Sequence, residues 1–222
     1  DLGAPDVVEV ARGLREAVDL GEARLQRQDH VVPRVAVGDG EHVQVVDLLP
    51  PRFEVHQRMY RPTQLVRIVE PLSGVPRITV RCDPRIGWEK GVPAKIEGSH
   101  HVRYEGFDAP LRLTTDLPLS HLGGRPFTLT ERKHFVLAWG SPIEEALPAL
   151  CERYLAETTR YWERWVKHCN IPPLYQQRVI RSALTLKLHC YEDSGAIVAA
   201  MTTSIPEAPG SGRTWDYRYC WL

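Results

Sequence analysis

Carboxylates are the side chains of this chain best suited to chemistry, because two of them placed together can act as general acid and general base. The candidates are Glu144, Glu145, Glu192, Asp193, Glu207 and Asp216. The first two stand at a predicted helix start, where acidic residues simply favour the helix dipole. The middle two close a predicted helix beside a turn glycine, and the last two lie in a loop without a partner acid. The residues alone therefore assign no catalytic carboxylate.

A cluster of aromatic side chains is the second candidate. The last nine residues, TWDYRYCWL, carry Trp215, Tyr217, Tyr219 and Trp221. Large rings are of little use at a frayed terminus, so either this segment folds into a core or the chain is cut where a site begins. From the residues alone, a hydrophobic plug is the favoured explanation.

Cysteine and histidine offer no clear site. The five cysteines are Cys82, Cys151, Cys169, Cys190 and Cys220, an odd number without a C-x-x-C motif. Such usage is typical of reduced thiols in a cytoplasmic protein. His168-Cys169 and His189-Cys190 are sequence neighbours, which point apart on a helix or strand, so we expect no metal site. The GSGR stretch lacks the lysine of a phosphate loop and is read as a hinge.

Composition excludes some partners. The 222 residues are 43% hydrophobic, and 28 Lys and Arg balance 28 Asp and Glu. Zero net charge gives no reason to expect binding to nucleic acid or to an anionic membrane. No apolar run approaches the roughly 18 residues of a membrane helix. We therefore expect a cytoplasmic protein with neither nucleic-acid nor membrane partners.

The elements that position these residues change type along the chain. From His42 to Trp139, short runs alternate in the period of a half-buried strand. In RITVRC, for example, Ile78, Val80 and Cys82 face inward and the intervening residues face outward. The other runs cover residues 42–48, 64–72, 101–107, 110–117, 126–131 and 133–139. Short strands at this spacing predict an antiparallel sandwich or barrel.

Helical spacing follows the strands. Ser141 is suited to cap a helix with Pro142 at its first position and Glu144 in a capping box. Pro148 kinks or restarts this helix, which is then expected over residues 149–168. A second helix is expected from Leu174 to Tyr191, with apolar residues around most of its circumference. Such a surface needs neighbours on several sides, and the chain offers too few.

Three stretches resemble glycoside hydrolase family 15, which holds glucoamylases, glucodextranases and some bacterial trehalases. The specific one is VIRSALTLKLHCYEDSGAIVAAMTTSIPEAPGSGRTWDYRYCWL. Upstream, RMYRPTQLVRIVEPLSGVPRITVRC and TTRYWERWV resemble the β-sandwich and linker helix that precede the catalytic domain in bacterial members. The likeness covers roughly residues 45–222.

The resemblance implies a fold and a site. The family's catalytic domain is an (α/α)6 barrel, and its first motif supplies aromatic side chains that contact the sugar. Tyr217 and Trp221 match those positions, whereas Trp215 and Tyr219 are expected to pack inward. The family's Arg-Asp pair would follow Leu222, and its catalytic glutamates would come later still. We expect neither cofactor nor metal.

The sequence thus predicts a β + α chain: an antiparallel β-sandwich, a linker helix and the first part of an incomplete (α/α)6 barrel. The expected boundaries are 1–41 unassigned, 42–140 sandwich, 141–170 linker and 171–222 catalytic domain, truncated. The expected function is a fragment of an inverting hydrolase that releases glucose from oligosaccharide or disaccharide α-glucosides. This fragment should be inactive and self-associate through its exposed helical face. The alternative is a non-catalytic carbohydrate-binding or interaction protein built on the sandwich.

Overall fold

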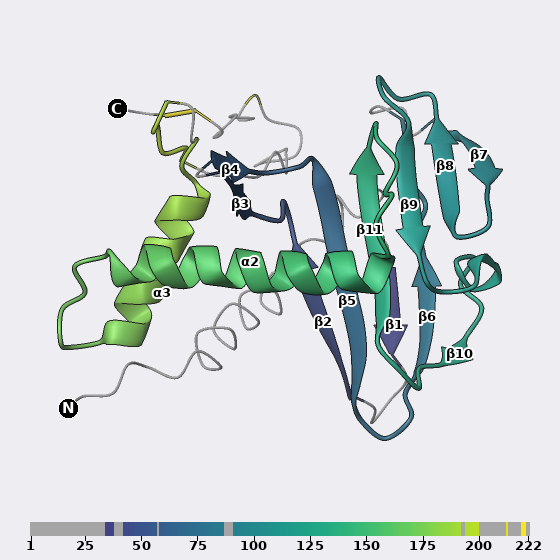
Figure 1. Cartoon of the computed structure of the whole chain (residues 1–222), viewed down its shortest axis with the longest axis horizontal. Coiled ribbons are helices and arrows are strands. Elements are labelled where there is room, and N and C mark those ends of the chain that lie inside the picture. The colour runs from purple at the N-terminus through teal and green to yellow at the C-terminus, as the bar shows by residue number, and fades with distance from the viewer. Residues whose placement is uncertain are drawn as a thin grey trace. The chain divides into compact units, whose positions relative to one another are not determined.

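The computed structural model describes residues 34–37, 42–56, 58–86, 91–191, 194–199, 212 and 219–220. The chain divides into two compact units (Figure 1). One unit runs from Asp29 to Trp162 and holds the strands; the other joins Asp1–Gln28 with Glu163–Leu222.

The larger sheet of the first unit has six strands, and every pair of neighbours is antiparallel. In sheet order, the strands are β2 (His42–Leu48), β5 (Gln64–Ser73), β11 (Lys133–Trp139), β9 (Leu111–Thr115), β8 (His101–Glu105) and β7 (Ala94–Glu97). All of these except β7 coincide with runs that the alternation predicts, and β5 extends one residue beyond its run. In β7 all four residues are exposed, so no alternation marks it.

A smaller sheet has three antiparallel strands in the order β1 (Arg34–Val37), β6 (Arg77–Arg81) and β10 (Phe127–Thr128). A separate hairpin joins β3 (Phe53–Val55) to β4 (Arg58–Tyr60). A short 3-10 helix, η1, spans Leu119–His121. The sequence did not reveal β1, β3 or β4, because three or four residues are too few to display a period.

Side chains from both sheets share one hydrophobic core. Ile78 and Val80 of β6 are fully buried, and Cys82 is nearly so, as the alternation in RITVRC predicts. They meet buried residues of β5, β8, β9 and β11: Leu65, Val69, Val102, Tyr104, Leu111, Leu113, Phe135 and Leu137. Each such side chain contributes about 1.5–3 kcal/mol by burial, so this core is the main source of stability of the first unit.

Helix α2 (Leu147–Lys167) covers the opposite face of the six-stranded sheet. A second cluster there joins Leu48, Val66, Ile68, Val136, Leu147, Leu150, Cys151 and Tyr154. The helix lies within two residues of its expected span, but its predicted start was wrong. Ser141 and Glu144 precede it without a helical turn, and Pro148 lies in the first turn. Proline is tolerated there because the first N–H groups of a helix have no intrahelical acceptor.

One buried contact fixes α2 to the segment that leads into β3. The backbone N–H of Arg52 donates to Thr158 Oγ1 at 2.9 Å, and the same hydroxyl donates to the carbonyl oxygen of Arg52 at 3.2 Å. The Arg52 guanidinium lies over the rings of Tyr161 and Trp162. Thr158 therefore satisfies two backbone groups that water cannot reach.

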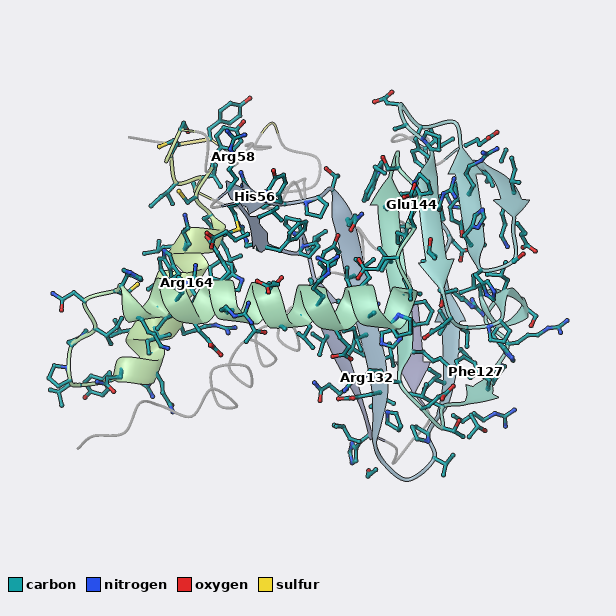
Figure 2. All side chains as sticks on the ribbon, in the orientation of Figure 1. His56, Arg58, Phe127, Arg132, Glu144 and Arg164 are labelled. Carbon is teal, nitrogen blue, oxygen red and sulfur yellow. The ribbon has the colours of Figure 1, made fainter. Side chains whose placement is uncertain are left out.

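Aromatic and ionic contacts extend this attachment. Phe53 stacks on Tyr154 of α2 with 5.1 Å between ring centroids, and on Tyr60 with 5.8 Å. Arg132, labelled in Figure 2, precedes β11 and binds both Glu70 of β5 and Glu152 of α2. The two carboxylates come from the sheet and from the helix, so a single guanidinium bridges them.

A buried histidine lies beneath α2. The ring of His134 bonds through Nδ1 to Asp116 Oδ2 at 2.7 Å, and its backbone N–H donates to Asp116 Oδ1 at 2.9 Å. Burial by itself raises the pKa of the Asp116 carboxyl, but these hydrogen bonds outweigh it and hold that pKa below its usual value. The carboxylate form therefore stabilises the fold.

We expect Thr158→Val to lower the free energy of unfolding by about 1–3 kcal/mol, because it removes the hydroxyl that bonds to the buried N–H and carbonyl of Arg52. Denaturant unfolding followed by circular dichroism measures the change. Thr185→Val is the matched control, since that exposed hydroxyl donates only to the Arg181 carbonyl of its own helix. Equal losses from both substitutions would contradict the role given to Thr158.

Acid should remove the contribution of Asp116 to the stability of the folded protein. A carboxyl whose pKa is lowered by folding stabilises the protein above its unfolded pKa of about 4, and this contribution disappears as the pH falls through the folded value. Between about pH 5 and pH 2, Asp116→Asn should therefore lose less stability than the unaltered chain. The exposed residue Asp108 provides a control in Asp108→Asn. If Asp116→Asn and the unaltered chain lost the same stability between about pH 5 and pH 2, Asp116 would not be the source of this pH dependence.

Candidate functional site

The carboxyl-terminal segment begins with helix α3 (Gln176–Leu188). Prolines at 172 and 173 precede it, and Tyr175 has a left-handed backbone with φ of 57°. At its other end, the N–H of His189 bonds to the carbonyls of both Thr185 and Leu186. The helix is therefore shorter at both ends than the expected span of 174–191.

A hairpin follows α3. Cys190 pairs with Ile197 in an antiparallel bridge, and the N–H of Tyr191 donates to the carbonyl of Ala196 at 2.7 Å. Gly195 turns the chain with φ of 76°, a conformation that favours glycine. The N–H of Ala199 then donates to the carbonyl of Tyr219 at 3.2 Å. This last bond places Tyr219 beside the hairpin that follows α3.

The four aromatic residues can be followed only in part. Tyr217 and Trp221, the predicted sugar contacts, and Trp215 lie outside the described residues. Tyr219 is 67% exposed, so the expectation that it packs inward was wrong. Its place is fixed by a backbone bond to Ala199, which leaves the ring free to project into solvent.

Much of the apolar surface of this unit is open. Ile180 and Leu184 of α3 are buried. Other large side chains are 44–74% exposed: Leu174, Tyr175, Leu186, Leu188, Tyr191 and Ile197. This agrees with the expectation that several apolar positions of the helix lack cover in this chain.

The carboxylates are not gathered into a catalytic pair within the described residues. Glu145 precedes α2 and accepts a hydrogen bond from Arg153 at 2.6 Å, which lowers the pKa of the Glu145 carboxyl. A general acid needs the opposite shift. Glu144, labelled in Figure 2, is exposed and follows the end of β11. Glu192, Asp193, Glu207 and Asp216 lie outside the described residues.

A second group of side chains that could be reactive lies beneath α2, where the thiol of Cys151 is near the His134–Asp116 pair. The thiol has no exposed surface, and burial raises its pKa to about 12, with smaller contributions from Asp116 and Glu152. The thiol, not the thiolate, is therefore present at neutral pH, and it is a poor nucleophile. Sequence reasoning missed the His134–Asp116 pair because 18 residues separate the two.

No group of three or more His, Cys, Asp or Glu side chains in the described part of the chain is placed to hold a metal ion. No described helix is both long and apolar enough to cross a membrane.

Comparisons with known proteins give a consistent result. Residues 173–222 match the sequence model of glycosyl hydrolases family 15. The trehalase of Mycobacterium tuberculosis is 35% identical over 173 residues, which cover 71% of this chain and 25% of that protein. The trehalase of Thermoplasma acidophilum is 31% identical over 162 residues, covering 70% and 28%. That of Thermoplasma volcanium is 48% identical over 68 residues, covering 31% and 11%. No solved structure matches.

The chain spans about a quarter of the length of the first two of these relatives. The alignments with them extend well beyond the last 50 residues, so the similarity also takes in much of the strand-bearing unit. The chain belongs to family 15 of the glycosyl hydrolases.

Proposed function

We propose that this chain is part of an inverting glycoside hydrolase that releases glucose from an α-glucoside, with trehalose as the favoured substrate. One observation carries the proposal: the family match over residues 173–222 coincides with similarity to proteins named trehalase over about 70% of the chain. Family membership alone would leave glucoamylase-like substrates equally favoured.

The architecture supports the assignment of successive parts of the chain to different domains. Two antiparallel sheets share one core whose buried residues lie within 42–140, as a β-sandwich requires, and β1 adds a strand from before that range to the smaller sheet. We assign residues 141–170 to a linker helix and 171–222 to the beginning of an (α/α)6 catalytic domain. The open apolar surface of α3 supports this assignment, because a helix of such a barrel packs against several neighbours. The same surface supports self-association of the isolated chain.

In this proposal the aromatic run forms one wall of the sugar site. Sugar rings present flat C–H faces, and indole and phenol rings offer matching apolar area with a polar edge for the hydroxyls. We assign contact with the sugar to Tyr217 and Trp221. The bond between Ala199 and Tyr219 supports this, because it holds the end of the run against the hairpin that follows α3.

The chemistry itself needs two carboxyl groups, about 6.5–9.5 Å apart, with a water molecule between one of them and the sugar. One protonates the departing oxygen and the other deprotonates the attacking water. Glu145 is held ionised by Arg153, so it does not suit the role of general acid, and no second carboxyl among the described residues is paired with it. We therefore place both catalytic groups in the part of the relatives' length that this chain does not span.

The 222-residue chain should accordingly hydrolyse neither trehalose nor maltose nor maltooligosaccharides, because it lacks the acid and the base. Glucose release is measured with a coupled assay against a buffer blank. The decisive control is Glu207→Gln, which removes a carboxylate of the loop that leads to the predicted site. Turnover that this substitution abolishes would show that our placement of the catalytic acids is wrong.

The aromatic wall can be tested without turnover. Saturation-transfer NMR should detect weak binding of trehalose, and Trp221→Ala or Tyr217→Ala should reduce the signal several-fold by removing the stacking surface. Tyr191→Ala is the matched control, since it deletes another exposed ring of the same unit. An equal loss from all three variants would indicate nonspecific contact with aromatic rings and would argue against the assignment.

A further inference from the structure

Strand β7 lies at one edge of the six-stranded sheet (Figure 1). It pairs with β8 on one side, and no described strand pairs with it on the other. All four of its residues are exposed. Ile96 is 43% exposed, and Val92, two residues before the strand, is 75% exposed. An open edge presents N–H and C=O groups to any further strand, so the sheet can be extended at β7.

The pairing of β7 with β8 decides which backbone groups point outward. The N–H of Gly98 donates to the carbonyl of His101 at 2.8 Å, so these two residues form a hydrogen-bonded pair. Such pairs alternate with non-hydrogen-bonded ones along an antiparallel ladder. Ile96 therefore directs its N–H and C=O toward β8, whereas Lys95 and Glu97 direct theirs to the open edge.

This arrangement is self-complementary about Ile96. Consider a second copy of β7 that runs antiparallel to the first, with the two Ile96 residues opposite one another. Lys95 of each copy then lies opposite Glu97 of the other, and both residues direct their backbone groups into the junction. Each of these two pairs exchanges two hydrogen bonds, as a hydrogen-bonded antiparallel pair does. The two Ile96 residues form the non-hydrogen-bonded pair between them, where side chains approach most closely.

The side chains fit the same register. Lys95 and Glu97 lie on one face of β7 and form an ion pair with 2.6 Å between the charged atoms. In the paired edge, each charge also meets its opposite across the junction, and the two Ile96 side chains meet on the other face. A shift of two residues would instead place Lys95 opposite Lys95 or Glu97 opposite Glu97. Lysine at an edge normally discourages pairing, but here Glu97 makes one register favourable.

We propose that β7 is the contact surface for a second copy of this chain, related to the first by a two-fold axis at Ile96. The six-stranded sheets of the two copies then continue into one another, and the interface is isologous, because the same residues contribute from both sides. The surface belongs to the first unit and is distinct from the open apolar surface of α3. It therefore adds a specific contact to the self-association already proposed for α3.

Charge reversal on the whole chain tests the register. Lys95→Glu and Glu97→Lys should each raise the dissociation constant of the dimer at least tenfold, because each places like charges opposite one another. An equimolar mixture of the two variants should associate to within about threefold of the unaltered chain, since both cross-strand pairs are then of opposite charge. Sedimentation equilibrium measures all three samples. Arg160→Glu is the control, because it reverses one charge of an exposed ion pair on α2.

A cross-link locates the contact. Two Cα atoms of a non-hydrogen-bonded pair are about 4.5 Å apart, which a disulfide can span. Mild oxidation of Ile96→Cys should therefore yield a dimer joined at position 96, identified by mass spectrometry of its peptides. Ala94→Cys is the matched control, because position 94 lies opposite Gly98 of the second copy and should not join to itself.

Three outcomes would overturn the proposal. The first is association that neither charge reversal weakens, as contact through α3 alone would give. The second is a mixture of the two variants that associates no better than either variant alone, which would attribute the loss to misfolding. The third is a disulfide at position 94 that forms as readily as one at position 96.

Discussion

The first unit depends on the burial of strands β5 and β11 on both faces. One face of each strand enters the core shared with β6, and the other lies under α2. Apolar side chains dominate the middle of such strands, and in β11 Phe135, Val136, Leu137 and Ala138 are consecutive and all buried. The polar groups that remain, such as His134, are bound to a partner drawn from a neighbouring segment.

This double burial explains which elements were predictable. Strands with one buried face, such as β6, β8 and β9, alternate in sequence and were identified by their period. Strand β11 was grouped with these runs, although its central residues are all buried and do not alternate. Strands β1, β3 and β4 are too short for a period, and β7 has no buried face. Their pairing depends on neighbours that a local pattern does not contain.

The start of α2 shows a different limit. Ser141, Pro142 and Glu144 form a good local start signal, yet the helix begins at Leu147. The segment between them carries the chain from the end of β11 to the cluster beneath the helix, where Leu147 and Leu150 are buried. Tertiary packing thus decides where the helix begins. The candidate sugar contacts were identified from family spacing alone, whereas the pair of His134 and Asp116 emerges only once the strands are paired.

Because Cys151 is buried beneath α2, the reactivity of its thiol measures how often the helix leaves the sheet. A thiol with no exposed surface, and with a pKa of about 12, reacts with an alkylating reagent only while the helix is lifted from the sheet. Cys220, by contrast, is exposed in the closed state. The chain therefore contains, without any substitution, a slow thiol that measures local opening and a fast one that calibrates the reagent.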